Sequence, residues 1–310
     1  MSETIGEIGE AAALARIFPR LPAAASTILG PGDDAAVIAA PDGRFVVTTD
    51  MMVHGPDFRL AWSTPFDLGW KAAASNLSDI AAMGAVPTAL VVAIAAPPDS
   101  PVALLEGIAD GLREACALLA PDCGVVGGDL SVSETLTIAV TAFGDLEGRA
   151  PITRSGAKVG DKVAVAGDLG LSAAGLRMLF EHGVHDITAL RGAPAIEAQL
   201  APCPPIALGR VAALAGATSM IDLSDGLALD ASRVAKASGV ALALDSAAVG
   251  SRDALDGGED HALLATFPGE LPEGFRAIGV VEAGSGVLVD GTPYAPGGWD
   301  PFTGWDGARG

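Results

Sequence analysis

The chain has 310 residues, half of them hydrophobic, and a formal net charge of -20 at pH 7. This length predicts about two domains, and the apolar fraction is sufficient for a large core. The negative field excludes binding of nucleic acid through overall charge, although a polyanion bridged by metal ions stays compatible with it. A membrane span is excluded because the longest apolar stretch, residues 89–96, is far below the roughly 20 residues that a spanning helix needs.

The cysteines and the N-terminus favour a cytoplasmic location. Cys116, Cys123 and Cys203 are an odd set without paired spacing. Such a set argues against a disulfide framework and suits a reducing compartment. The first ten residues carry three Glu and no basic residue, which is not the pattern of a signal peptide.

The first half of the chain alternates predicted helices and strands. Thr64 before Pro65 is a favourable helix start, because a Thr N-cap is followed by Pro in the first turn. Short continuous apolar runs are typical of buried strands. The expected helices cover residues 5–18, 65–83 and 101–119, and the expected strands cover residues 35–40, 45–49, 90–95, 125–126 and 136–143.

A polar break at Arg149-Ala150-Pro151 is the predicted domain boundary, giving domains of residues 1–149 and 150–310. A second block of alternating elements follows the break, so the α/β class is expected for both halves. In this block the expected helices cover residues 171–180, 206–215 and 227–238, and the expected strands cover residues 162–166, 219–223, 240–244, 262–267, 276–281 and 286–289.

Aspartates gather where predicted strands end, which is where α/β folds build their sites. Mg²⁺ prefers oxygen ligands, and several converging carboxylates would repel one another unless metal ions lay between them. We therefore predict a hard-cation site. Any single one of these aspartates is more simply explained as a turn former or helix cap, but the whole set is not. The aspartates are Asp34, Asp50 after Thr48-Thr49, Asp129 after Gly127-Gly128, and Asp222 and Asp225 around Ser224, with Asp79 inside a predicted helix.

Phosphate groups would have to be neutralised here without a P-loop, because the chain has only four lysines and no G-x-x-x-x-G-K-[ST] motif. Gly127-Gly128 and the turn at residues 167–170 could present backbone N–H groups to a phosphate, and Arg154 could contact a nucleotide. Tight turns and a solvated linker arginine explain the same residues equally well. His54 and His261 have no Ser or Cys partner at a telling spacing, so a hydrolytic triad cannot be argued.

Taken in order, the motifs resemble those of the thiamine-monophosphate kinase family, which belongs with aminoimidazole ribonucleotide synthetase and selenophosphate synthetase. The resemblance covers nearly the whole chain, and the ordered set is specific although each motif alone is weak. The motifs are Gly32-Asp33-Asp34-Ala35, Thr48-Thr49-Asp50, Asn76-Leu77-Ser78-Asp79-Ile80-Ala81-Ala82-Met83-Gly84-Ala85, Gly127-Gly128-Asp129, Thr153-Arg154-Ser155-Gly156-Ala157, Ile221-Asp222-Leu223-Ser224-Asp225-Gly226 and Gly257-Gly258-Glu259-Asp260.

The resemblance implies transfer of the ATP γ-phosphate to thiamine phosphate, giving thiamine diphosphate and ADP. It also implies a two-domain synthetase-like fold of the α/β (α+β) class, in which the N-terminal domains of a homodimer form a shared β-barrel. The implied ligands of several Mg²⁺ ions are Asp34, Thr48, Thr49, Asp50, Asp79, Asp129, Asp222 and Asp225, with Asp222 and Asp225 as the catalytic pair; the implied ATP contacts are Gly128, Asp129, Arg154 and Ser224, and the implied thiamine phosphate contacts are Asp57, Glu259 and Trp299.

The chain departs from the family pattern at a few places. Asp57-Phe58 stands where a His-Phe pair is usual, Leu171 replaces an acidic or polar residue, and residues 245–257 are shorter than usual. Two alternatives stay open: another ATP-dependent synthetase of the same superfamily, and a non-catalytic metal-binding homologue. Selenophosphate synthetase generally uses a reactive N-terminal Cys, whereas the first Cys here is Cys116. Intact Asp motifs in both halves argue against the non-catalytic reading. Asp225 alone is also explained as a cap of the helix that follows it.

Overall fold

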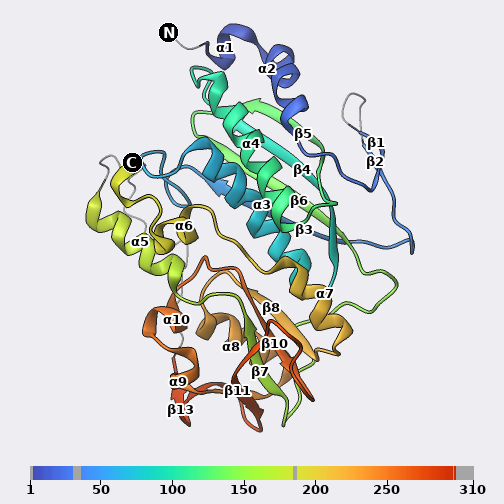
Figure 1. The fold of residues 1–310 in the computed structure, drawn as a ribbon, viewed down its shortest axis with the longest axis vertical. Coiled ribbons are helices and arrows are strands. Elements are labelled where there is room, and N and C mark those ends of the chain that lie inside the picture. Colours follow the sequence, from blue (N-terminus) through green and yellow to red (C-terminus); the bar gives the residue numbers. More distant parts are fainter. Residues whose placement is uncertain (1–2, 31–35, 184–186, 296, 298–310) are drawn as a thin grey trace.

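The computed structural model describes residues 3–30, 36–183, 187–295 and 297. Within these residues it has the expected mixed α/β architecture, with a four-stranded sheet, a seven-stranded sheet and a small pair of strands, β1 (Thr27–Leu29) and β2 (Val37–Ile38). Figure 1 shows the sheet from the first half above the sheet from the second half along the long axis of the molecule. No helix in the described part of the chain has the length and apolar character needed to cross a membrane.

The four-stranded sheet has the strand order β3 (Val46–Val53), β6 (Thr137–Asp145), β4 (Val86–Ala96) and β5 (Val125–Val132). Its neighbouring strands are antiparallel except β4 and β5, which are parallel. Helices α3 (Pro65–Ala82) and α4 (Val102–Leu119) cover one face of this sheet (Figure 1). Because side chains alternate along a strand, Leu90, Ile138 and Val140 all lie on that face, where they are buried.

Helix α3 begins where the sequence predicts. The Thr64 side chain accepts a hydrogen bond from the Asp67 N–H, and the Asp67 carboxylate accepts one from the Thr64 N–H, which is a capping box. Helix α4 then packs very closely on α3 at Gly69 and Gly111. A Cβ atom at Gly111 would lie 2.0 Å from the carbonyl oxygen of Phe66, so only glycine allows this approach.

Gly111→Ala is therefore expected to lower the free energy of unfolding. Overpacking of a core costs about 1–3 kcal/mol, which exceeds the roughly 1 kcal/mol that Ala gains over Gly as a helix former. Thermal unfolding followed by circular dichroism checks this. Gly269→Ala is the matched control, because a Cβ there meets nothing within 4 Å. Equal melting temperatures for the two variants would contradict the packing argument.

The seven-stranded sheet is built from the second half of the chain, and β12 and β9 are its parallel pair among the described strands. Its strand order is β13 (Thr292–Tyr294), β12 (Gly286–Val289), β9 (Ala241–Leu244), β11 (Arg276–Glu282), β7 (Lys162–Ala166), β10 (Ala262–Phe267) and β8 (Ser219–Leu223). The helices of this half are α5 (Leu171–His182), α6 (Pro194–Leu200), α7 (Ile206–Leu214), α8 (Leu227–Ser238), α9 (Ser246–Val249) and α10 (Arg252–Asp256), with a 3₁₀ turn at Thr188–Leu190.

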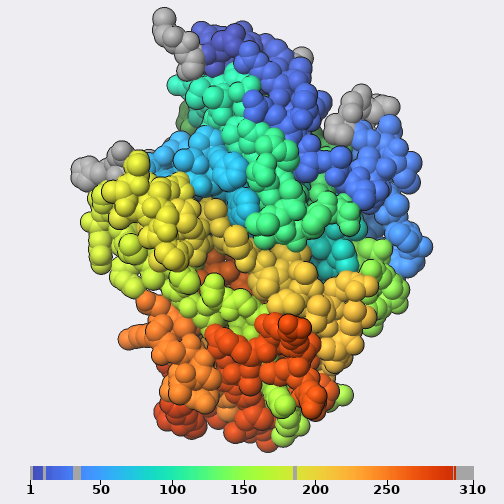
Figure 2. All heavy atoms as spheres, in the orientation of Figure 1, coloured from blue at the N-terminus to red at the C-terminus, as the bar shows by residue number. Residues whose placement is uncertain are grey.

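The two halves share buried contacts. The largest apolar cluster joins Leu77 and Ile80 of α3 to Met220 of β8 and Phe267 of β10. A smaller cluster joins Trp62 to residues of α5 and α6. In Figure 2 the yellow-green α5 region accordingly lies directly against blue residues of the first half. The end of β8 is thereby held next to α3.

Several expected elements differ from the observed ones. The helix predicted over residues 5–18 is broken at Gly9, whose φ of 76° ends α1 (Ile5–Ile8) before α2 (Glu10–Ile17) and a 3₁₀ turn at Phe18–Arg20. The strands predicted over residues 45–49 and 125–126 continue as β3 and β5 to Val53 and Val132. Asp50 and Asp129 therefore lie within strands and not at their ends. Residues 31–35, which include Asp34, lie outside the described residues.

Candidate active site

Three of the predicted carboxylates come together from three elements: Asp50 on β3, Asp79 on α3 and Asp222 on β8. Thr48 Oγ1 donates a hydrogen bond to Asp79 Oδ2 at 2.7 Å, and the Asp50 N–H donates to Asn76 Oδ1 at 3.0 Å. These two bonds hold the middle of β3 against α3. Because Thr48 and Asp50 are two positions apart on a strand, both lie on the α3 face of the sheet.

The charges of this acidic cluster (Asp50, Asp79 and Asp222) act on one another. Burial, followed by the nearby charge of Asp222, raises the pKa of Asp79 to about 7. Burial also raises the pKa of Asp50, and the charges of Asp222 and Glu259 act in the same direction. Carboxylates held together in this way favour a bound cation.

A divalent cation fits the cluster only with help from a ligand. The described residues contain no preformed group of three or more His, Cys, Asp or Glu side chains placed to hold a metal ion. Mg²⁺ commonly binds one or two carboxylates and takes further oxygens from substrate phosphates and water. The cluster suits that mode of binding, because its oxygen donors are hard and its three carboxylates exceed the charge that the neighbouring His261 could offset.

Asp225 follows the cluster in the turn after β8. Its carboxylate lies 2.6 Å from the Arg233 guanidinium, and its N–H donates to the Asp230 carboxylate at 3.1 Å. Helix α8 has Gly226 at its N-cap and no side-chain cap hydrogen bond. The alternative explanation of Asp225 as a helix cap is therefore wrong.

His261 joins the cluster to α3, a role that the sequence analysis missed. Its Nε2 lies 3.2 Å from Ser75 Oγ, and its Nδ1 lies 3.3 Å from Ser78 Oγ and 3.4 Å from Asp222 Oδ2. Burial lowers the pKa of His261, but the hydrogen bond to Asp222 and the charge of Glu259 outweigh burial and raise it. Ser75 Oγ donates to the Lys71 carbonyl, so this Ser is engaged with its own helix and is not an activated nucleophile.

A cavity of about 280 Å³ contains two of the predicted substrate contacts, Asp57 and Glu259. The loop at residues 55–63 lines it on one side, and α5 and α6 line it on the other. Lys71 of α3 reaches its wall and forms an ion pair with Glu259, with 2.5 Å between Nζ and Oε2. Phe58, Trp62 and Phe180 give the rest of the cavity an aromatic lining. Since Glu259 acts on Asp50, the cavity and the acidic cluster are neighbours.

Three predicted site residues lie apart from the cluster. Thr49 has the opposite orientation to Thr48 on β3, and its hydroxyl donates to the Val140 carbonyl at 2.9 Å. Gly128 and Asp129 lie on β5, the far edge of the sheet, so β6 and β4 separate them from β3. That separation is roughly 14 Å at the usual strand spacing.

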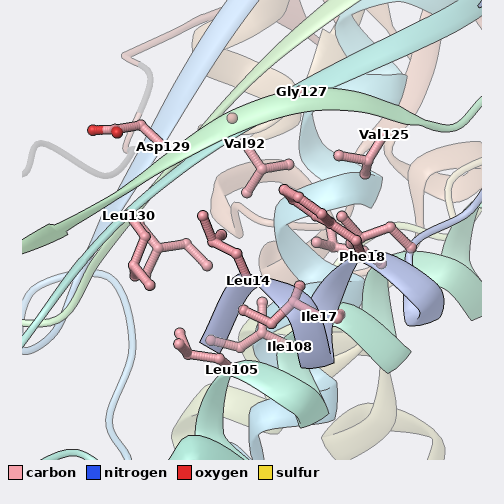
Figure 3. Close-up of a pocket in the computed structure, with 15 residues that line it drawn as sticks. Leu14, Ile17, Phe18, Val92, Leu105, Ile108, Val125, Gly127, Asp129 and Leu130 are labelled. Atoms are coloured by element: carbon pink, nitrogen blue, oxygen red, sulfur yellow. The ribbon is translucent and has the colours of Figure 1, made fainter. Parts of the chain in front are cut away.

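Asp129 also faces away from the helices. Figure 3 shows its carboxylate pointing away from a small apolar cavity of about 80 Å³ between α2, α4 and the β4–β5 pair. Leu130, its neighbour on β5, lies on the cavity side together with Leu14 and Ile108 (Figure 3). In a single copy of the chain, therefore, Asp129 does not meet Asp50, Asp79 or Asp222.

Of the remaining predicted contacts, one lies near the acidic cluster, one lies away from it, and two lie outside the described residues. Ser224 stands in the same turn as Asp225, and its carbonyl accepts the Glu259 N–H at 2.7 Å. The Arg154 carbonyl accepts a hydrogen bond from Ser238 at the last residue of α8, so helix α8, about 18 Å long, separates Arg154 from Asp225. Asp34 and Trp299 lie outside the described residues.

One N–H group of the turn at residues 167–170, that of Gly170, is already bonded to a carboxylate. The Gly170 and Ser172 N–H groups at the start of α5 donate to the Asp260 carboxylate at 2.5 Å and 2.9 Å. Asp260 therefore occupies two N–H groups at the helix terminus that the glycine pattern suggested for a ligand, so these two are not available to a phosphate.

Part of the chain matches a known protein family, and the whole fold matches a solved structure. Residues 32–146, which carry Asp50, Asp79 and Asp129, match the family model "AIR synthase related protein, N-terminal domain". The solved structure of AaThiL complexed with AMPPCP and TMP superposes with a TM-score of 0.76 at 34% sequence identity, covering 86% of this chain and 90% of that one. Residues 32–146 therefore belong to the class of AIR synthase-related N-terminal domains.

Two curated relatives with high sequence identity identify the family within this class. Thiamine-monophosphate kinase of Mycobacterium tuberculosis is 45% identical over 98% of this chain and 93% of its own length. The enzyme of the same name from Corynebacterium glutamicum is 40% identical over 96% of this chain and 95% of its own length. The chain belongs to the thiamine-monophosphate kinase family.

Proposed function

We propose that the chain is a thiamine-phosphate kinase, which transfers the ATP γ-phosphate to thiamine phosphate and releases thiamine diphosphate and ADP. The observation that carries this proposal is the acidic cluster beside a cavity whose walls hold Asp57, Lys71 and Glu259. The relative solved with AMPPCP and TMP supports it, because an ATP analogue and TMP are bound together by that protein.

The proposed chemistry needs positioning and charge compensation more than acid-base catalysis. A phosphate oxygen of the acceptor is already a nucleophile near neutral pH, so no strong general base is required. Phosphoryl transfer depends mainly on holding donor and acceptor in line and stabilising the charge between them. Asp222 of β8 and Asp225 of the turn after it, together with Asp50 of β3 and Asp79 of α3, would orient the phosphates through the cations that they would hold.

Mg²⁺, when bound, would neutralise the phosphate oxygens and leave the donor phosphorus open to attack. Asp50, Asp79 and Asp222 are described residues that would hold it. Thr48, which donates to Asp79, and Asp225, whose charge acts on Asp50, also remain proposed ligands. Gly128, Asp129, Arg154 and Ser224 remain proposed contacts of ATP. Trp299 remains a proposed contact of thiamine phosphate, and Asp34, Thr49 and Asp129 remain proposed metal ligands.

The proposal is tested by incubating the purified chain with ATP, Mg²⁺ and a panel of phosphorylated acceptors, followed by chromatography of the products. Thiamine diphosphate should form from thiamine phosphate, and simple phosphate monoesters should not be phosphorylated. Excess chelator should abolish the reaction, and restored Mg²⁺ should recover it. ATP consumption without thiamine diphosphate, or full activity in chelator, would overturn the proposal.

We also propose a homodimer in which the two four-stranded sheets close into a shared barrel. The sheet face opposite α3 and α4 supports this, because Val47 and Met51 are 54% and 62% exposed there. Exposed apolar side chains on one sheet face are typical of an interface. We also propose that the chain is cytoplasmic and that its two domains are residues 1–149 and 150–310.

Met51→Glu is expected to convert the dimer to a monomer, because it buries a charge in that interface without a partner. Light scattering at micromolar concentration measures the mass. Val159→Glu is the control, since Val159 is equally exposed, at 61%, but lies outside the four-stranded sheet. A wild-type monomer, or a Met51→Glu dimer, would contradict this interface.

A further inference from the structure

A buried ammonium group lies at the wall of the proposed substrate cavity. Lys71 is one of only four lysines in the chain, and 6% of its surface is exposed. Its Nζ lies 2.5 Å from Glu259 Oε2 and donates to the Gln199 carbonyl at 3.1 Å. Glu259 keeps 38% of its side chain exposed, and both residues line the cavity. A ligand in the cavity therefore meets both members of this ion pair.

The position of Glu259 is fixed by the backbone. Its φ of 69° is uncommon for a residue with a side chain, and its N–H donates to the Ser224 carbonyl at 2.7 Å. Such conformations persist where the surroundings impose them, often at ligand sites. Burial acts to raise the pKa of Glu259, but the charges of Lys71 and His261 outweigh burial and lower it. Glu259 is therefore an anion held in place at neutral pH.

We propose that this ion pair is exchanged when thiamine phosphate binds: the cationic thiazolium ring replaces Lys71 beside Glu259, and the phosphate group replaces Glu259 beside Lys71. This inference rests on the proposed function for its substrate. It makes Lys71, which the sequence analysis left without a role, a substrate contact. The ion pair would also make binding selective for acceptors that carry both a cation and a phosphate group.

The selectivity follows from the cost of an unpaired buried charge. Removing one partner of a buried ion pair is strongly unfavourable, because it leaves the other charge desolvated and without a counter-charge. A ligand with a cation and a phosphate leaves neither Lys71 nor Glu259 unpaired. A phosphate ester without a cation would open the pair and leave Glu259 unpaired next to Asp57, the second carboxylate of the cavity. Such an ester should bind poorly even where its shape fits.

The matched probes are thiamine phosphate and its deaza isostere, in which carbon replaces the ring nitrogen and removes the positive charge. Dissociation constants for both are measured by calorimetry with the wild-type chain in Mg²⁺. We expect the charged compound to bind about a hundredfold more tightly. In Glu259→Gln the preference should fall below about threefold, because an amide no longer requires a cation.

Two lysine variants complete the design. Lys71→Gln should weaken the binding of both probes alike, because both carry the phosphate that Lys71 contacts. Lys162→Gln, an exposed lysine on β7, should change neither. If the ion pair only fastens α3 to the segment before β10, Glu259→Gln will lower the melting temperature and leave the preference between probes as it was.

The wild-type measurement decides the inference even if a variant fails to fold. Dissociation constants within about threefold of each other would overturn the exchange. A hundredfold preference that survives in a folded Glu259→Gln variant would overturn it as well. The same wild-type preparation is assayed for thiamine diphosphate formation. Absence of that product contradicts the proposed function, while the ratio of dissociation constants still tests the exchange.

Discussion

Asp222→Asn should lower turnover at saturating ATP and Mg²⁺ by about a thousandfold or more, because a lost metal ligand removes several kcal/mol of transition-state stabilisation. The variant should stay folded. Asp222 is 5% exposed, and its Oδ2 accepts a hydrogen bond from Ser78 Oγ at 3.1 Å, which an Asn oxygen can also accept. The change therefore removes a charge while keeping the shape and the hydrogen bond. Turnover and melting temperature of the same preparation check both parts.

Asp253→Asn is the control for a lost carboxylate outside the site. Asp253 pairs with Arg177 at 2.7 Å on an exposed surface, where such pairs contribute little. Its turnover should stay near wild type. Asp225→Asn should also lose most turnover, and it will lose the ion pair to Arg233, although Arg233 keeps Asp230 at 2.5 Å. Near-normal turnover in Asp222→Asn would remove Asp222 from the active site.

Local signals predict much of the fold. Thr64 and Pro65 mark the start of α3 because capping is a property of adjacent residues. Strand ends are harder, because a strand continues for as long as a neighbouring strand offers hydrogen bonds. β3 extends past Asp50 to Val53 because β6 pairs with it along that whole length. No composition rule marks that end, so a polar residue such as Asp50 suggests a strand terminus that the structure does not have.

The site was predicted only in part, since its residues meet across the two sheets. The acidic motifs identify Asp50, Asp79 and Asp222, but nothing local shows that Asp129 lies on the opposite edge strand. Lys71 and His261 were overlooked for different reasons. Lys71 lies eight residues before Asp79 on α3, so helical periodicity could have placed both on one face of a buried helix. His261 acts through contacts with α3 and β8 that only the tertiary structure creates.

Metal-free protein should lose stability as the pH rises from about 4 to 7, and Asp79 should account for part of that loss. The unfolded pKa of Asp79 is 3.8, and its folded value is about 7. Between these values the folded state binds more protons than the unfolded state, so the free energy of unfolding falls as the pH increases. Above pH 7 Asp79 is ionised beside Asp222 in the folded state, and there it lowers the free energy of unfolding most.

Asp79→Asn should remove this loss. In chelator at pH 8 the variant should be more stable than wild type by up to about 4 kcal/mol, and at pH 4 the two should be nearly equal. Burial also raises the pKa of Asp230 to about 7. Asp230 is present in both proteins, so its contribution to the pH dependence is the same in each. Urea unfolding at the two pH values measures the difference.

Added Mg²⁺ and ATP should make the wild-type chain the more stable of the two proteins at pH 8, because ligands that bind the folded state stabilise it more when they bind more tightly. A wild-type chain more stable than Asp79→Asn at pH 8 without metal would show that the carboxylates of the cluster do not repel one another, and would remove the electrostatic reason for placing a cation between them.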